Sequence, residues 1–505
     1  MKNWKKTALL GGVSLVMGVP TSAQAQSANV APAPAAATSP AEAVIVVTGS
    51  RIVRDGADAP TPVTVISSER LTELGATNIG EALNQVPAFR PTVTPSTNGL
   101  NAASAGARIA DLRGLGPLRT LVLVNGRRFT PSTAQGTIDL NMIPSALIDR
   151  VEVVTGGASA AYGSDAVAGV INLILDTDLN GIKASAQYGQ SDHSDNRDYL
   201  VSMAAGTSLL GGRGHLVVGG EYNENGGVGD CMTRDWCQPH YGTIFNSRPG
   251  VGGLPALIMI QNANASGLTP SGLITAPGPL AGLQFGPDGR TIGGYQFGTY
   301  YSPNGVFMQG GTGEGDRDAY LSGYLLKVPV TRYNAYGHFD LDLGSGLSLF
   351  SELSYGQVRA SALSAQTRDK TLQISVENPF LPDSLRQTMI DQGIGSFTFG
   401  RSGLDLGRAQ ARARTRTFGG VLGLRGELGG TWKWDAYYQY GRTTYLQLTS
   451  NNRITSNFAL ALDAVEAPDG SAVCRSSLTN PGNGCMPLNC GSACKKDPVM
   501  GVIGV

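Results

Sequence analysis

The chain has 505 residues, with 38 basic and 38 acidic side chains and a formal net charge of +0. This balance argues against nucleic-acid binding, which requires a basic surface. Charged residues make up only 15% of the chain and glycines number 69, a composition that suits a β-barrel or sandwich better than a helical enzyme.

Residues 1–25 are predicted to form a cleavable secretory signal. Lysines in "MKNWKK" precede the apolar stretch "TALLGGVSLVMGV", and an A-x-A pattern of small residues ends at Ala25. The alternative is an uncleaved membrane anchor. It is disfavoured because the stretch is shorter than the ~20 residues of a membrane span and contains Gly11, Gly12 and Gly18. We therefore expect the mature chain to be exported.

An Ala/Pro-rich linker, residues 26–41, separates this signal from the β-prone run "EAVIVVTGSRI" at 42–52. Nothing near this run can bury it. An extended segment on a disordered tether can add as a strand to the edge of another protein's sheet, where backbone hydrogen bonds give affinity. The alternative is an ordinary first strand of the domain that follows.

Residues 53–178 are predicted to form a small mixed α/β domain. Its first part, "SSERLTELGATNIGEALNQVPAF", indicates two short helices, with Ser67 or Ser68 and then Asn78 as caps. Gly75 is expected to end the first helix and Pro87 the second.

The second part of this domain is predicted to be mainly strands. "RTLVLVNGRRF" is typical of two strands joined by a tight turn at Asn125 and Gly126. "NMIPSALIDRVEVVTGG" favours a short helix that leads into a strand, and "GVINLIL" a closing strand.

Residues 183–489 are predicted to form part of an antiparallel transmembrane β-barrel. In "TRYNAYGHFDLDL", Tyr333 and Phe339 alternate with Arg332 and His338, so one face suits lipid and the other water. A soluble sandwich also alternates and remains the alternative. About seven strands are expected, near 183–190, 197–208, 214–225, 330–343, 347–358, 414–428 and 431–447.

Short and long connections alternate between these strands, except that the first outer connection, "SDHSDN" at 191–196, is brief. The short ones lie at 209–214, 343–346 and 428–431, and the long ones at 226–329, at 359–413 and from 449 onward. Outer-membrane barrels have short periplasmic turns and longer external loops. The long connections are therefore expected to lie outside the cell.

Two pairs of cysteines fall in these long connections. In an exported protein, Cys231 with Cys237 and Cys474 with Cys485 are most simply loop disulfides, with metal binding as the alternative. The histidines at 193, 215, 240 and 338 show no metal-ligand spacing, so no metal site is predicted. "TGGASAAYG" has Ala161 where a nucleophile elbow needs its second glycine, and we predict no enzyme activity.

The run "LRGLGPLRTLVLVNGRR", followed by "IPSALIDRVEVVTGGASAAYGSDAVAGVINLIL", resembles the plug domain of TonB-dependent outer-membrane receptors. "VIVVTGSRI" resembles the TonB box that precedes such plugs. The likeness is strongest to the receptor branch of sphingomonad- and xanthomonad-type bacteria. It implies that TonB binds Glu42, Ala43, Val44, Ile45, Val46, Val47 and Thr48. It also implies that the plug motif comprises Arg113, Gly114, Asn125, Gly126, Arg127, Arg150, Glu152, Gly156, Tyr162, Gly163, Gly169 and Asn172.

This resemblance implies a receptor in the outer membrane of a Gram-negative cell, with a plug accessible from the periplasm. Its partners would be outer-membrane lipid and TonB, which is driven by the proton-motive force of the inner membrane. The cargo would be a ferric siderophore, cobalamin or an oligosaccharide, and no cofactor is expected. The plug tips at 95–108 and 129–137 carry no aromatic cage or basic cluster that would identify the cargo.

The main departure from the family is strand number, because plugged receptors need about 22 strands and this sequence indicates about seven. The tail at 490–505 lacks alternation, so a truncation or frameshift after Asn489 is expected, and with it a chain that does not insert alone as an intact receptor. Two alternatives to transport remain. One is an exported plug module that binds TonB, and the other is a passive porin.

Overall fold

The computed structural model describes residues 63–99, 104–156, 158–239, 241–246, 253, 255–301, 306–311, 325–364, 367–403, 407–429 and 432–489. The predicted signal, linker, TonB-box-like run and tail lie outside these residues, as does His240. Among the helices that are described, none is both long and apolar enough to cross a membrane.

The N-terminal part is a mixed five-stranded sheet with the order β1-β4-β5-β2-β3. β2 and β5 are parallel and pair Thr120 with Gly169, whereas the other neighbours are antiparallel. The strands are β1 (Val63–Ser67), β2 (Thr120–Val124), β3 (Arg127–Arg128), β4 (Ile148–Val154) and β5 (Gly169–Leu175).

Short helices and turns join these strands largely as predicted. Asn78 caps α2 by accepting a hydrogen bond from the Gly80 N–H at 2.7 Å, and Gly75 has the left-handed φ of 62° expected after the first helix. The second helix ends at Leu83 rather than at Pro87, because the chain turns at Asn84. The helices are α1 (Ser68–Glu73), α2 (Ile79–Leu83), η3 (Pro117–Arg119), η4 (Leu140–Met142), η5 (Ser145–Leu147), α3 (Ser159–Tyr162) and η6 (Ser164–Ala166).

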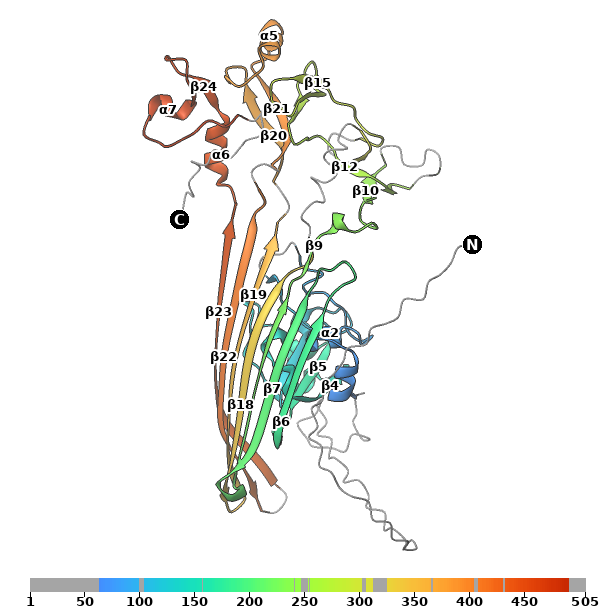
Figure 1. Cartoon of the computed structure of the whole chain (residues 1–505), viewed down its shortest axis with the longest axis vertical. Coiled ribbons are helices and arrows are strands. Elements are labelled where there is room, and N and C mark those ends of the chain that lie inside the picture. Colours follow the sequence, from blue (N-terminus) through green and yellow to red (C-terminus); the bar gives the residue numbers. More distant parts are fainter. Residues whose placement is uncertain are drawn as a thin grey trace, which may run out of the picture.

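The second unit is an antiparallel seven-stranded sheet, here called the wall, with the order β23-β22-β19-β18-β8-β7-β6. The predicted strands are confirmed, and three of them extend further toward the long connections. The wall strands are β6 (Gly181–Gly189), β7 (Asp198–Leu209), β8 (Gly214–Asn225), β18 (Val330–Gly344), β19 (Leu347–Leu363), β22 (Gln410–Leu428) and β23 (Trp432–Ser450). Short turns, including η7 (Leu210–Gly212), join them at one end (Figure 1).

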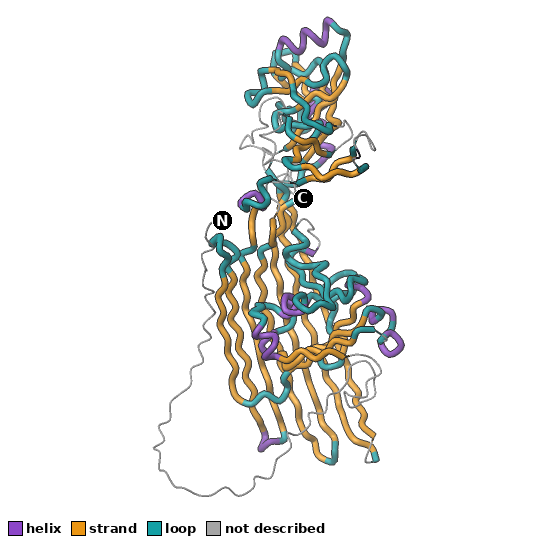
Figure 2. Tube along the Cα trace, turned by 90° about the vertical axis from the view of Figure 1, so that its right-hand side faces the viewer, coloured by secondary structure: helices purple, strands orange, loops and turns teal. Residues whose placement is uncertain are grey.

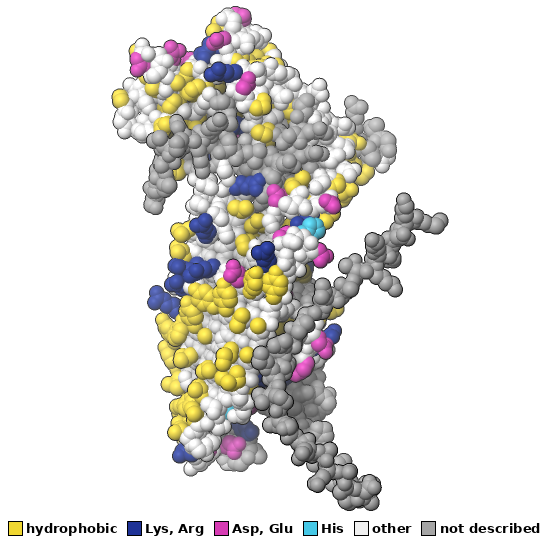
Figure 3. Space-filling model, viewed as in Figure 1, with side chains coloured by type: hydrophobic (Ala, Val, Ile, Leu, Met, Phe, Trp, Pro, Cys, Tyr) yellow, Lys and Arg dark blue, Asp and Glu magenta, His cyan; other side chains and the backbone are white. Residues whose placement is uncertain are grey.

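The wall distributes its side chains in the opposite way to a soluble sandwich. Along β18, Arg332, Asn334 and His338 are buried, whereas on other wall strands Val201 and Leu353 are each 56% exposed. Figure 3 shows hydrophobic side chains gathered on the outer surface of the wall. A buried polar face and an exposed apolar face are what a lipid-facing barrel requires.

The N-terminal sheet packs against the polar, inner face of the wall (Figures 1 and 2). One apolar cluster joins the two units, since it includes Leu147 of the N-terminal domain and Ala204, Val217 and Tyr336 of the wall. The interface therefore combines an apolar contact with the polar groups of the inner face.

The long connections, which were expected only as loops, fold into a separate apical cluster beyond the wall (Figure 1). Its largest sheet has the order β15-β14-β13-β21-β20, and its core includes Phe397, Phe399 and Met389. This cluster was not predicted, because its strands are short and β13 pairs with β21, far along the chain, at Leu273 and Gly400.

The remaining elements belong to these connections. Cys231 is joined to Cys237, and Cys474 to Cys485, within them. The strands are β9 (Val228–Asp230), β10 (Gly242–Phe245), β11 (Leu257–Ile260), β12 (Ala263–Ala265), β13 (Leu273–Ala276), β14 (Leu283–Phe285), β15 (Ile292–Gly294), β16 (Phe307–Gln309), β17 (Leu325–Lys327), β20 (Arg368–Ser375), β21 (Ser396–Ser402), β24 (Ala464–Glu466) and β25 (Ala472–Cys474). The helices are η8 (Cys231–Thr233), α5 (Asp383–Asp391), α6 (Thr455–Leu462) and α7 (Arg475–Thr479).

Candidate functional site

The candidate site is the interface between the N-terminal sheet and the wall, and it is built around the β2–β3 turn. Asn125 and Gly126 have φ values of 49° and 74°, as a two-residue turn of this kind requires. The Asn125 side chain accepts a hydrogen bond from the Leu175 N–H at 2.8 Å, and the Gly126 N–H donates to the Asn172 side chain at 2.9 Å. These bonds fix the turn to β5.

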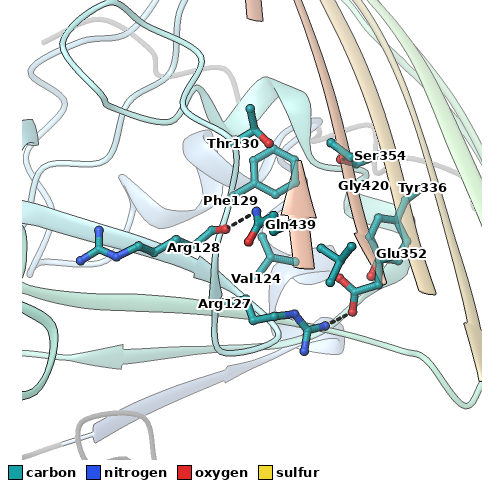
Figure 4. A pocket seen from close by; sticks show the side chains of 12 residues that line it. Val124, Arg127, Arg128, Phe129, Thr130, Tyr336, Glu352, Ser354, Gly420 and Gln439 are labelled. Carbon is teal, nitrogen blue, oxygen red and sulfur yellow. Dashed lines mark hydrogen bonds and ion pairs between the residues drawn. The ribbon is translucent and has the colours of Figure 1, made fainter. Parts of the chain in front are cut away.

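The turn presents Arg127 to the wall. Its guanidinium pairs with Glu352 of β19 and lies 5.0 Å from the ring centre of Phe350 and 5.6 Å from that of Tyr437 (Figure 4). Cation–π contacts and a charged hydrogen bond reinforce each other at a partly dry site. Arg127 is therefore anchored by wall side chains.

The wall extends this ion pair into a chain of charges. Glu352 lies 3.5 Å from His338 Nδ1, and the other ring nitrogen of His338 contacts Asp340. Asp340 in turn pairs with Arg425 of β22. The ion pair of Arg127 is thus linked to charged side chains on three wall strands, β19, β18 and β22.

The next residue, Arg128, pairs instead with Asp165 of its own domain and donates to the Tyr162 carbonyl at 2.7 Å. The bond from Arg128 lowers the pKa of Asp165. The Arg128 carbonyl accepts a hydrogen bond from the Gln439 side chain of the wall at 2.9 Å. The hollow lined by Arg127 and Glu352 is about 20 Å³, room for a single water (Figure 4), whereas a larger hollow of about 550 Å³ lies beside Arg128 and Asp165.

A second cluster surrounds Arg108, which is buried. Its guanidinium donates to Glu81 at 2.7 Å and to the Asn141 side chain at 2.7 Å, and Lys327 lies 3.5 Å from Glu81. Burial alone would raise the pKa of Glu81, but the neighbouring positive charges of Arg108 and Lys327 outweigh it and lower this pKa to about 2. Glu81 therefore remains ionised near neutral pH.

A third cluster is centred on the wall residue Arg332, which is fully buried between the two units. It pairs with Glu221 and donates to the Thr77 carbonyl at 2.5 Å and to the Asn223 side chain at 3.2 Å. Glu221 also accepts a hydrogen bond from the Ser145 N–H at 3.0 Å. One wall ion pair thus binds two separate backbone segments of the N-terminal domain.

Part of the predicted plug motif supports the N-terminal sheet from within. Glu152 accepts a hydrogen bond from Arg150 at 3.0 Å and another from Asn172 at 3.4 Å, so it links β4 to β5. At Gly169 a side chain would collide with the Val154 carbonyl oxygen, which explains why glycine stands there.

The other motif residues lie at turns near one edge of this sheet. Arg113 donates to the Thr155 carbonyl at 2.9 Å, beside Gly156. Gly114 and Gly163 have φ values of 67° and 95°, conformations that favour glycine. Of the predicted motif, only the β2–β3 turn places a charged side chain on the wall.

Five charged residues at this interface were not singled out from the sequence. They come from distant segments, so no local spacing identifies them. The sequence pattern that could have identified one of them is the alternation of polar and apolar residues in β18, which places Arg332 on the polar face of the strand. These residues are Glu81, Arg108, Glu221, Arg332 and Glu352.

Comparison with known families gives a match for the N-terminal domain. Residues 55–170 match the TonB-dependent Receptor Plug Domain. This family comprises receptors that transport, not enzymes. The matched range contains the β2–β3 turn and both Arg108 and Arg127.

Several solved structures are similar to this chain. A mutant of the ferric enterobactin receptor from Pseudomonas aeruginosa, in complex with enterobactin, is 16% identical with a TM-score of 0.41, and the match covers 76% of this chain and 41% of that one. The siderophore receptor PirA from Acinetobacter baumannii is 17% identical with a TM-score of 0.35, covering 76% and 48%. PiuA from the same organism is 15% identical with a TM-score of 0.35, covering 85% and 50%.

The chain thus spans half or less of the length of these three receptors. Its N-terminal sheet is held by charged side chains against the polar face of an antiparallel wall, and the family match includes β1 to β4 and the start of β5. Residues 55–170 are therefore a plug domain of the TonB-dependent receptor family.

Proposed function

We propose that this protein is a TonB-dependent outer-membrane receptor that takes up a ligand such as a ferric siderophore, cobalamin or an oligosaccharide. The observation that carries this proposal is a family plug domain docked on the buried polar face of a wall whose opposite face is apolar. A plug in that position closes a passage, and the apolar face suits lipid.

The chemistry of the docking contacts suits a gate that is opened by force. Much of the interface consists of ion pairs and hydrogen bonds, which water can replace when the two surfaces separate. A wholly apolar interface would instead expose hydrophobic surface on opening, at roughly 25 cal/mol per Å². Plug release through polar contacts is therefore the less costly route.

TonB is the proposed source of that force, through residues 42–48, which precede β1. Val44, Ile45 and Val46 form a β-prone run that can add to an edge of the periplasmic sheet of TonB. Tension on this run would reach the plug through the chain that leads into β1.

Binding to TonB tests this proposal directly. The Val46→Pro variant removes a backbone N–H from the strand and should weaken binding of the purified chain to the periplasmic domain of TonB at least tenfold. Val30→Pro, in the Ala/Pro linker, is the matched control and should bind normally. Equal affinity for all three proteins, measured by calorimetry, would contradict the TonB assignment.

Uptake by cells distinguishes the receptor from the two alternatives. Ferric enterobactin, cyanocobalamin and maltohexaose serve as radiolabelled probes of the three cargo classes. A receptor accumulates one of them only while the proton-motive force is intact. Flux that survives an uncoupler indicates a porin, and TonB binding without any uptake indicates a plug module.

A further inference from the structure

The outer face of the wall carries a row of arginines beside its apolar surface. The two-residue period of β22 places Arg412, Arg414 and Arg416 on that face, followed toward the short turns by Phe418 and Leu422. Phe418 and Leu422 are 44% and 55% exposed. The strand thus changes from cationic to apolar partway along its length.

Neighbouring strands enlarge this row into what we call the arginine patch, formed by Arg359, Arg412, Arg414, Arg416 and Arg442. Arg359 of β19 lies directly opposite Arg414, and Arg442 of β23 lies opposite Phe418. Figure 3 shows Lys and Arg side chains gathered above the hydrophobic surface of the wall.

Within the described part of the chain, no carboxylate forms an ion pair with the arginine patch, and its polar contacts are to neutral groups. Arg416 donates to Gln357 at 2.6 Å, and Arg359 donates to the Tyr333 hydroxyl at 3.4 Å. Like charges directly opposite each other in a sheet repel, so a bound anion would stabilise this arrangement. The arginines at the interface between the plug and the wall, by contrast, are paired with glutamates.

The position of the arginine patch identifies the kind of anion. A row of outer-face aromatics crosses the wall, and the patch lies on the side of this row that is nearer the long connections. Aromatic rows mark the boundary between hydrocarbon and head groups, where an exposed arginine costs little. The row consists of Tyr188, Tyr199, Tyr222, Tyr333, Tyr355, Phe418 and Tyr440.

We propose that the arginine patch binds the phosphates of an anionic lipid in the outer leaflet, a site that rests on the proposed membrane location. Guanidinium groups match phosphate oxygens in bidentate pairs. Exposed Leu446 and Leu448 flank the patch on β23, and Phe418 and Leu422 lie beyond it. Acyl chains attached to the head group can cover these apolar side chains, which a free anion cannot.

Lipid binding by the purified chain in neutral detergent micelles tests the site. The probe is lipid A with two phosphates, titrated against the wild type, the triple variant Arg412→Gln/Arg414→Gln/Arg416→Gln and the control Arg290→Gln. Each arginine near a lipid surface is worth roughly a fivefold change in affinity, so the triple variant should bind about 100-fold more weakly. Arg290, in the apical cluster, should have no effect.

Each outcome decides the matter. A triple variant that binds as tightly as the wild type overturns the proposal, as does displacement of lipid A by millimolar inorganic phosphate, which would indicate a free-anion site. If the triple variant loses its β-sheet circular dichroism, the single variant Arg414→Gln decides, with about fivefold weakening expected and unchanged affinity overturning it. TonB is absent from this measurement, so failure of the lipid site can be distinguished from failure of the TonB assignment in the Val46→Pro test.

Discussion

Glu81 illustrates how single residues hold the plug at this interface. It accepts a hydrogen bond from buried Arg108 and lies 3.5 Å from Lys327 of β17, so its negative charge interacts with two cations. The carboxyl has its pKa lowered from 4.5 to about 2, and a group of this kind stabilises the folded state above its unfolded pKa. That stabilisation is lost as the pH falls from about 4.5 through about 2.

We expect Glu81→Gln to destabilise the folded chain by about 2–3 kcal/mol at pH 7, because Arg108 then lacks its charged partner. The wild type should lose stability as the pH falls from 4.5 to 2 because Glu81 becomes protonated, and the variant should lack this part of the loss. Thermal unfolding followed by circular dichroism across this pH range measures both effects. Glu73→Gln is the control, since Glu73 pairs with Arg70 on the exposed surface. Parallel acid profiles for wild type and Glu81→Gln would contradict the role of Glu81.

The Arg127–Glu352 pair is predicted to couple the plug to the wall by about 2 kcal/mol, in the range found for contacting charged residues. The test is a double-mutant cycle that compares the wild type with Arg127→Gln, Glu352→Gln and the double variant. The quantity measured is the rate of hydrogen exchange of the β2 amides in the full chain. The control is Arg128→Gln, because Arg128 pairs within the plug. Strictly additive effects of the two substitutions would show that the pair does not hold the plug.

At the scale of elements, plug and wall fit because several wall glycines accept plug side chains. A Cβ at Gly356 of β19 would lie 2.7 Å from Met142 Sδ, and one at Gly219 of β8 would lie 2.7 Å from a methyl group of Leu147. Such spacing is too close for real atoms, so a larger residue would force the plug side chain to move, and at Gly356, where the Met142 Cα lies 3.1 Å from the added Cβ, the plug backbone as well.

The Gly356→Ala variant should therefore loosen plug docking by about 1–3 kcal/mol, the usual effect of overpacking. Undocking exposes the β2–β3 turn, so trypsin should cut after Arg127 faster than in the wild type. Gly420→Ala on the outer face is the control, because its Cβ would meet no plug atom within 4 Å and would lie at an ordinary 3.5 Å from Leu353. Equal cleavage rates for the two variants would argue against the glycine contacts.

The wall and the plug elements could be predicted from the sequence because each depends on local pattern. Alternation located β18, where Arg332 and Tyr333 have opposite environments, and Asn125–Gly126 located the β2–β3 turn. The charged clusters could not be predicted, because residues such as Arg127 and Glu352 are far apart in the sequence and meet only where the plug docks on the wall. The apical cluster could not be predicted for the same reason, since β13 and β21 pair although they are far apart in the sequence.

At the scale of the whole molecule, the two ends of the wall differ strongly. One end has only short turns such as Leu209–Gly214, and the other carries the apical cluster with both disulfides (Figure 1). Disulfides persist in oxidising surroundings, and outer-membrane barrels place their long connections outside. The apical cluster should therefore face the medium and the short turns the periplasm.

Cysteine labelling in intact cells tests this orientation. With Cys490 and Cys494 replaced by serine to remove background, Arg290→Cys in the apical cluster should react with a membrane-impermeant maleimide. Gly211→Cys, in a short turn, should react only after the outer membrane is permeabilised. The ratio of the two labelling rates should exceed about tenfold in intact cells and approach one after permeabilisation, because only the barrier separates the sites. Similar rates in intact cells would mean that the wall does not span the outer membrane, and the receptor proposal would then fail for this chain.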